Sequence, residues 1–211
     1  MSHEMAASHG HEHEVDPSLP LEYQAEENRL RIFGFWVFLG AEIVLFACLF
    51  GTYLVLHNRA AGGPTSMHLF DYKSFMYETV DLLTSSFTCG LGIHEMRRGN
   101  KKGLIAWLLV TALLGIGFVS LEINEFITYA THGAPMQRSA FLSAFFTLVG
   151  THGAHVSLGI LWMLSIIIQI AVKGITPITA RKAFIVGLYW HFLDVIWVFL
   201  FTVVYLTGKV L

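Results

Sequence analysis

Nine acidic and histidine side chains lie within stretches of the sequence that are otherwise apolar. A charged group at the centre of a membrane helix costs roughly 2.5 to 3.5 kcal/mol on insertion scales, so each of these residues needs a bonding partner or a function. Such groups relay protons, bind lipid headgroups, ligate metals or hydrogen-bond neighbouring helices. The main candidates are Glu42, His152, His155, His191 and Asp194, and the secondary ones are Glu78, Asp81, Glu122 and Glu125.

Helical rise places the main candidates at different depths from the secondary ones. Glu42 and Asp194 lie about 15 Å from the first residues of their apolar runs, and His152 about 16 Å, so we expect these three to converge near the middle of the membrane. The four secondary candidates lie closer to helix ends, where partial hydration lowers the cost of a charge. They therefore require less explanation.

Spacing predicts which of these side chains act together. Residues three apart share a helix face, so His152 with His155, and His191 with Asp194, should each present a pair to one neighbouring helix. Three interpretations of these pairs stay open: interhelical contacts that set helix register, a proton relay or lipid-headgroup site, and a bound redox centre.

A metal site finds little support in the residue types. Di-iron bundles place one Glu on each of two helices and Glu-x-x-His on two others. Glu122 with Glu125, and His152 with His155, reproduce only that spacing and not the pairing of residue types. We therefore predict no metal site in this chain.

The composition favours a protein that lies within a membrane. The 211 residues are 55% hydrophobic and only 13% charged, whereas soluble domains carry about 25% charged residues. The net charge of −2 argues against a nucleic-acid partner. Five apolar runs are each long enough to cross a hydrocarbon core of about 30 Å as a helix, and they cover residues 32–56, 75–93, 104–129, 141–172 and 183–206.

These runs predict an all-α fold. A membrane segment must bond its backbone internally, and the alternating pattern of a membrane β-barrel is missing from the sequence. We therefore expect a polytopic, up-and-down bundle of five transmembrane helices over residues 30–211.

Residues 1–29 differ from the rest in being polar and acidic, which predicts a disordered tail. The alternating histidines from His9 to His13 are able to hold a transition metal loosely. In a polar segment such histidines are more typical of a solvated chain, so we expect no metal there.

The distribution of Lys and Arg predicts the orientation of the bundle. Nine of the 13 lie on the side of the N-terminus and of the second and fourth connections, and four lie on the other side. The positive-inside rule therefore places the N-terminus in the cytoplasm and the C-terminus outside.

Four segments on different predicted helices carry a family pattern. They are FGFWVFLGAEIVLF (Phe33–Phe46), EINEF (Glu122–Phe126), THGAHVSLG (Thr151–Gly159) and YWHFLDVIWVFLFTVVY (Tyr189–Tyr205). In this order, over about residues 30 to 208, the chain resembles subunit III of the haem–copper respiratory oxidases. Two further stretches, Glu22–Arg31 and HEMRRG (His94–Gly99), look closer to the bacterial quinol oxidase branch, the menaquinol enzymes in particular.

The resemblance implies an accessory subunit that carries no cofactor of its own. Haem and copper would belong to the catalytic subunit I, and this chain would bind phospholipid, stabilise that subunit and support proton uptake. Glu42 matches the carbodiimide-reactive glutamate of the family, and the two histidine-containing pairs match its polar and lipid-associated positions. Mitochondrial members have seven helices, the first two of which form one arm of a lipid-filled cleft, whereas five are predicted here.

We therefore expect a subunit of a proton-pumping terminal quinol oxidase in the plasma membrane of a bacterium. The complex would oxidise quinol and reduce oxygen to water, with subunits I, II and IV as partners. One alternative is subunit III of a five-helix cytochrome c oxidase. Others are a proton-coupled transporter that uses Glu42, the histidines and Asp194 as a relay, although no inverted repeat is seen, and a membrane di-iron or haem protein.

Overall fold

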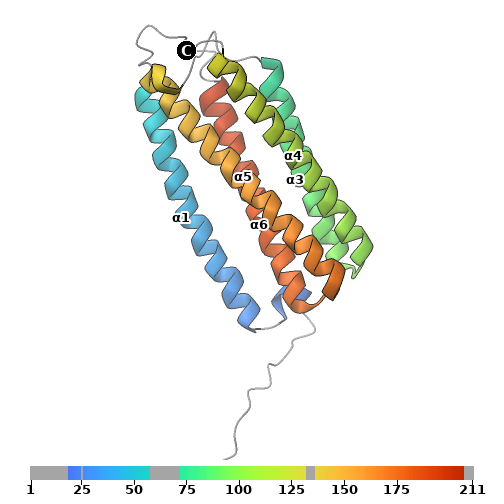
Figure 1. Ribbon diagram of the computed structural model, residues 1–211. Helices are drawn as coiled ribbons and strands as arrows, with labels where there is room; N and C mark the ends of the chain where they lie inside the picture. The colour runs from blue at the N-terminus through green and yellow to red at the C-terminus, as the bar shows by residue number, and fades with distance from the viewer. Residues whose placement is uncertain (1–18, 25, 58–71, 132–135, 207–211) are drawn as a thin grey trace, which may run out of the picture.

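The computed structural model describes residues 19–24, 26–57, 72–131 and 136–206. Within these ranges the chain is helical and has no β-strand. The long helices run up and down (Figure 1) and are α1 (Glu26–Leu56), α3 (Tyr72–Arg97), α4 (Lys101–Thr131), α5 (Ala140–Lys173) and α6 (Pro177–Leu200). Three short elements accompany them, the 3-10 helices η1 (Leu21–Tyr23) and η2 (Met136–Arg138) and a π-helical turn η3 (Phe201–Leu206) that continues α6.

The helices extend beyond the apolar runs. α1 begins at Glu26 and not near residue 32, and α6 begins at Pro177 and not near residue 183. The predicted runs followed apolar residues alone, so they begin later in the sequence than the helices that contain them.

Local sequence stops the helices at defined residues. Thr176 and Thr179 form a capping box at the start of α6, with Pro177 in the first turn. Gly174, at φ 75°, ends α5, and its N–H donates to the Ile170 carbonyl over 2.9 Å. Glycine adopts this positive φ without strain, so the chain is able to turn directly after α5. Only residues 174–176 then separate α5 from α6.

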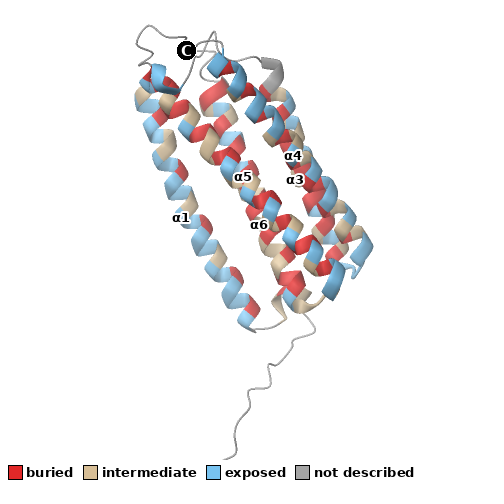
Figure 2. Cartoon of the chain, in the orientation of Figure 1, coloured by how far each residue is buried: buried red, intermediate tan, exposed pale blue. Residues whose placement is uncertain are grey.

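The helices are arranged around α5 and α6. α5 contacts α1, α4 and α6, while α6 contacts α1, α3 and α5. α3 packs closely along α4, so these two helices form one edge of the bundle and α1 forms the other (Figure 1). α1 is the most exposed of the long helices that could span a membrane, with 17% of its most apolar stretch buried (Figure 2).

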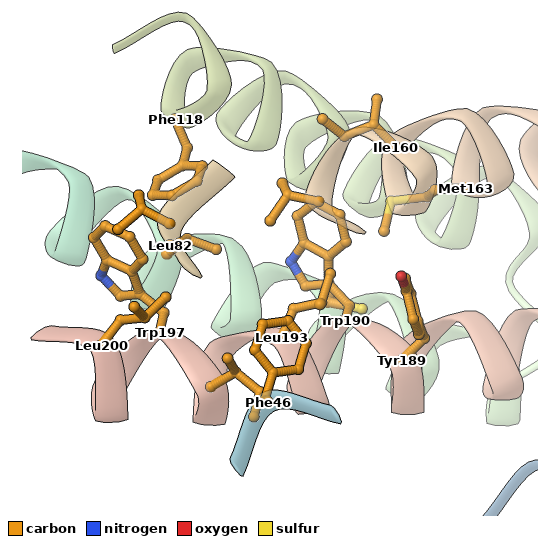
Figure 3. Packing of buried hydrophobic residues seen from close by; sticks show 14 of the residues in the cluster. Phe46, Leu82, Phe118, Ile160, Met163, Tyr189, Trp190, Leu193, Trp197 and Leu200 are labelled. Carbon is orange, nitrogen blue, oxygen red and sulfur yellow. The ribbon is translucent and has the colours of Figure 1, made fainter. Parts of the chain in front are cut away.

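Buried residues recur every seven positions on the two edge helices. On α1 they are Ile32, Leu39, Phe46 and Tyr53, and on α3 they are Phe75, Leu82, Cys89 and Met96. A seven-residue repeat keeps one line of side chains facing a neighbouring helix, as in left-handed bundles. The tryptophans of α6 fill the centre, and Trp190 and Trp197 pack with Phe46 and Phe118 around them (Figure 3).

Four of the described helices are long and apolar enough to cross a membrane: α1, α4, α5, and α6 with its π-helical continuation. The fifth predicted span lies in α3, which is long enough but is the least apolar of the long helices, because it carries acidic and hydroxyl side chains. The structure is therefore that of an all-helical, multi-pass membrane protein.

The predicted disordered tail, residues 1–29, is wrong at its C-terminal boundary. η1 packs against the bundle, and the Glu22 side chain is fully buried, where it accepts hydrogen bonds of 2.8 and 3.1 Å from Arg97. These hydrogen bonds supply the buried carboxyl group of Glu22 with a partner, without which its burial would be costly. Residues 1–18, with the histidines from His9 to His13, lie outside the described residues.

Candidate functional site

Glu42 of α1 and His155 of α5 form a polar contact between these helices. Glu42 Oε2 lies 3.2 Å from His155 Nε2, and the two side chains are 14% and 19% exposed. The other ring nitrogen, Nδ1, lies 2.7 Å from the Thr151 carbonyl of the preceding turn, to which it donates because a carbonyl only accepts. The imidazole is thus oriented by its own helix to face the carboxyl group of α1.

His152 has a different environment from His155. It is fully buried, and its Nε2 donates to the Leu193 carbonyl of α6 over 3.2 Å. Its ring contacts Phe118 and Trp197, with centroid separations of 5.8 and 5.3 Å. Its Nδ1 has no hydrogen-bond partner among the described residues.

The expectation that His152 and His155 address one neighbouring helix is therefore wrong. Three residues turn a helix through roughly 300°, which leaves the two side chains about 60° apart. Because α5 is central, that angle directs one ring to α1 and the other to α6. The Phe46 ring of α1 lies beside both imidazoles, with ring centroids 5.3 Å from His155 and 6.5 Å from His152.

His191 and Asp194 of α6 do address a common neighbour, α3. His191 Nδ1 lies 2.7 Å from the Ser86 hydroxyl of that helix. Asp194 is 6% exposed, and its carboxylate faces the same serine and Cys89. Trp190, one turn earlier, donates to Ser85 over 3.0 Å, so hydroxyls of α3 meet successive turns of α6.

The expected convergence of Glu42, His152 and Asp194 takes a different form. Glu42 contacts His155, His152 contacts the backbone of the residue before Asp194, and Asp194 faces α3. The polar groups therefore form separate interhelical contacts and not one shared centre.

Three of the four secondary candidates are far more deeply buried than their sequence positions predict, whereas Asp81 is partly exposed. Glu78, Glu122 and Glu125 are exposed by only 0%, 3% and 7%. Tyr129, one turn along α4, donates a hydrogen bond to Glu125, and both oxygens of Glu78 lack a hydrogen-bond partner within the described ranges. The expectation that these acids are partly hydrated is wrong, because their neighbouring helices extend far enough to cover them.

A glycine makes room for one of these acids. A Cβ atom at Gly153 of α5 would collide with the carboxyl group of Glu122. The acid of α4 thus rests on the backbone of α5. The three buried acids Glu78, Glu122 and Glu125 therefore lie inside the bundle and not on its surface.

A sequence signal for this burial exists. Glu78 and Ser85 fall between the buried positions Phe75, Leu82 and Cys89, at the alternating spacing of three and four residues that marks a core stripe. Glu122 and Glu125 continue the same spacing along α4. Reading the heptad position of each acid, and not only its distance from a helix end, would have placed these side chains inside the bundle.

Sequence reasoning also missed a polar layer at the end of the bundle where α1 begins. Asn28 of α1 donates to the Pro177 carbonyl over 3.3 Å and accepts a bond of 2.5 Å from Arg181. Beside it, burial and the neighbouring Glu22 raise the pKa of Tyr23, while Arg97 opposes this shift. These residues fix η1 and α1 to α3 and α6.

No group of three or more His, Cys, Asp or Glu side chains within the described ranges is arranged to hold a metal ion. The contacts above are instead hydrogen bonds and one acid–imidazole pair between neighbouring helices. Such contacts set helix register. Fold and site together define a polytopic helical membrane protein whose helices are joined by buried acids and histidines.

Within that class the family is shown by sequence comparison. The family model described as cytochrome c oxidase subunit III matches residues 24–209, and the chain belongs to this family. Quinol oxidase subunit 3 of Bacillus subtilis (strain 168) and that of Bacillus spizizenii are each 55% identical to it over 202 residues, which cover 96% of this chain and 97% of each relative. Cytochrome c oxidase subunit 3 of Bacillus sp. (strain PS3) is 47% identical, covering 93% of this chain and 95% of that relative. The resemblance found in the four sequence segments is confirmed.

Proposed function

We propose that this chain is the accessory subunit III of a terminal quinol oxidase, with menaquinol as the electron donor. The observation that carries this proposal is the 55% identity, over 96% of the chain, to proteins named quinol oxidase subunit 3. The complex would oxidise quinol to quinone, reduce oxygen to water and translocate protons. This chain would serve the complex without touching either substrate.

The proposed division of labour puts haem and copper in the catalytic subunit I, with subunits II and IV as further partners. In this chain the acids and histidines bond one helix to another, as Glu42 does with His155. We propose that these residues keep the helices in register and so maintain the surface that contacts subunit I. We also propose that they support proton uptake by the complex. No residue of this chain is assigned a catalytic role.

We further propose that all five long helices cross the plasma membrane of a bacterium, with the N-terminus in the cytoplasm. α3 is the least apolar, but its acidic residue Glu78 points inward, and residues such as Val80, Leu83 and Phe87 are exposed to the surroundings. The contacts Arg97 to Glu22 and Arg181 to Asn28 bring basic residues to the same end of the bundle. An excess of Lys and Arg at one end is typical of the cytoplasmic side.

A phospholipid is the proposed occupant of a groove between α1 and α6. The groove has a volume of 520 Å³ and is lined by apolar side chains such as Leu39, Ile43 and Phe199, with His191 as its single ionisable residue. An acyl chain matches such a lining, since it offers no hydrogen bonds and requires none.

A cytochrome c oxidase is the second candidate, favoured by the 47% identity to the subunit of strain PS3. The two complexes differ in the electron donor, which binds outside this chain in either case. The fold of subunit III therefore supports both equally, and the higher identity to the quinol oxidase subunits decides the order.

The test is purification of the native complex through a tag on this chain in a mild detergent. We expect a larger haem-bearing polypeptide to copurify, with oxygen uptake driven by quinol and not by reduced cytochrome c. Uptake driven only by cytochrome c would favour the second candidate. A chain that purifies alone, without haem, would overturn both proposals, and reconstitution into vesicles would then test proton transport.

A further inference from the structure

A groove lies between α3 and α4, the helix pair at the opposite edge of the bundle from α1 (Figure 1). It has a volume of 790 Å³. Unlike the groove beside α1, it carries several polar side chains, which are Asp81 and Thr84 from α3 with Ser120 and Asn124 from α4. Apolar residues such as Val80, Leu114 and Leu121 make up most of the remaining lining. Thr84, Ser120 and Asn124 are exposed on the surface of the bundle.

The acid of this groove lies deep along the helices. A Cβ atom at Gly117 would be 3.2 Å from Asp81 Oδ2, so the carboxyl rests on the backbone of α4 at that glycine. Gly117 is roughly 24 Å from the first residue of α4, a helix that is about 46 Å long. Asp81 is therefore at the middle of the bundle, where an ionisable group facing lipid is costly.

The backbone of Phe118 in α4 interacts with the Asp81 carboxyl group, but one oxygen of this carboxyl is left without a donor among the described residues. Oδ2 is buried and has no hydrogen-bond partner within the part of the chain that the structure describes. The neighbouring hydroxyls are directed elsewhere, since Thr84 donates to the Val80 carbonyl over 2.6 Å and Ser120 donates to the Ile116 carbonyl over 2.7 Å. A buried acceptor without a donor costs about 1 to 3 kcal/mol, so a donor from outside the chain would stabilise this site.

The exposed face of α1 shows what a lipid-facing surface of this protein looks like. Phe33, Val37 and Val44 are each more than 60% exposed there, and all three are apolar. Acyl chains suit that face but offer nothing to a carboxyl group. A lipid headgroup carries donors, but it stays at the membrane surface, about 15 Å from the centre of the hydrocarbon core.

We propose that a transmembrane helix of another subunit docks in the α3–α4 groove and donates a hydrogen bond to Asp81. This inference rests on the proposed function, since it requires an oxidase complex. A helix is the occupant that carries a fixed donor to mid-membrane depth. The small side chains of Thr84 and Ser120, with Gly117 between them, let the partner backbone approach closely.

The first test uses the whole purified complex with a photoreactive benzoylphenylalanine in place of Ser120. After irradiation we expect a cross-link whose partner peptide, identified by mass spectrometry, lies in a transmembrane helix of a different subunit and has a donor side chain within one helical turn. Adducts with lipid alone, or with a second copy of this chain, would overturn the inference. If no other polypeptide copurifies at all, it is the proposed function that fails.

The second test asks whether Asp81 is the anchor. Asp81→Leu should lower the cross-link yield and speed the loss of this subunit from the complex in detergent by about threefold to tenfold, the range for an interhelical hydrogen bond. Asp81→Asn retains an acceptor oxygen and should behave like the unmodified chain. An unchanged yield in Asp81→Leu would show that the groove docks its partner without this residue.

A matched pair of serines separates docking from general destabilisation. Ser120→Leu fills the groove and should release the subunit faster, again by about threefold to tenfold. Ser165 of α5 is also exposed and also donates to its own helix, to the Trp162 carbonyl over 2.7 Å, so Ser165→Leu is the control. Equal effects of the two substitutions would overturn the assignment of the groove.

Discussion

Glu42 and His155 face each other across the contact between α1 and α5. The imidazole donates from Nδ1 to the Thr151 carbonyl, which leaves Nε2 to face Glu42 Oε2 at 3.2 Å. Each helix thus contributes one side chain to the contact, and the hydrogen bond to Thr151 fixes which ring nitrogen meets the carboxyl group.

The substitution Glu42→Gln tests this arrangement. An amide has the same shape and is still able to donate to Nε2, so we expect this subunit to stay in the complex, with a change in stability of less than about 1 kcal/mol. Because an amide does not react with carbodiimide, labelling of the intact subunit, measured by mass spectrometry, should be lost. Glu27→Gln, at the exposed start of α1, is the control and should leave labelling of Glu42 unchanged. Loss of the whole complex in Glu42→Gln would contradict the prediction.

Ser86 and His191 should be energetically coupled. Each is the other's partner across α3 and α6, at 2.7 Å, so removing either one leaves a polar group without its bond. In a double-mutant cycle of Ser86→Ala and His191→Phe, followed by thermal denaturation in detergent, we expect a coupling free energy of about 0.6 to 2 kcal/mol. Additive single effects would show that the two side chains do not interact in the membrane.

Gly115 should not tolerate a methyl group. A Cβ atom there would lie 2.6 Å from the Trp190 ring, which is itself 1% exposed and held by a bond to Ser85. Gly115→Ala should therefore lower the free energy of unfolding by about 1 to 3 kcal/mol. Gly90, in α3, has nothing within 4 Å of its Cβ position, so Gly90→Ala is the matched control and should be neutral or mildly stabilising. Similar denaturation temperatures for both variants would refute this account.

The ion pair that anchors η1 should matter more than its neighbour. Arg97 donates to the fully buried Glu22, whereas Arg98 is 67% exposed and lies 3.5 Å from Glu95. Arg97→Gln should lower the free energy of unfolding by about 1 to 3 kcal/mol. We expect a value near the lower limit, because Arg97 is half exposed and solvent screens its charge. Arg98→Gln should change stability by less than about 0.5 kcal/mol. The comparison is made by thermal denaturation and by limited proteolysis near residue 24.

Because of Tyr23, we expect the free energy of unfolding to fall at alkaline pH. Burial, with a smaller effect of Glu22, raises the pKa of its phenol above the usual 10.0. The unfolded chain then loses this proton at a lower pH than the folded chain, so stability falls as the pH rises above about 10. Tyr23→Phe should remove that part of the pH dependence, as measured by the difference in denaturation temperature between the two proteins. A parallel decline in both would show that Tyr23 is not responsible.

Much of the architecture was predictable from the sequence because membrane helices obey local rules. Backbone groups in lipid must be bonded within the segment, so each apolar run already implies a helix. Turn residues such as Gly99 and Gly174, both with positive φ, fall where two of the connections were expected. The family, too, is encoded in side chains that are readable in order along the chain.

The pairing of polar residues was not predictable in this way. Depth and spacing placed Glu42, His152 and Asp194 together, but the angle between α5 and its two neighbours sends His152 to α6 and His155 to α1. Glu78, near the start of α3, was expected to be hydrated and is fully buried. Distance along one helix says nothing about which other helix covers a side chain.

The sequence by itself thus determined the helical class, the order of the helices and the set of polar residues that need partners. Only the tertiary structure decided which partner each one meets, because partners such as Glu22 and Arg97, or Ser86 and His191, are 75 and 105 residues apart. Local propensity acts within a few turns of a helix. Contacts between distant helices depend instead on how side chains from different helices pack together. In this bundle they include aromatic rings, residues that recur every seven positions, and side chains that pack on glycines.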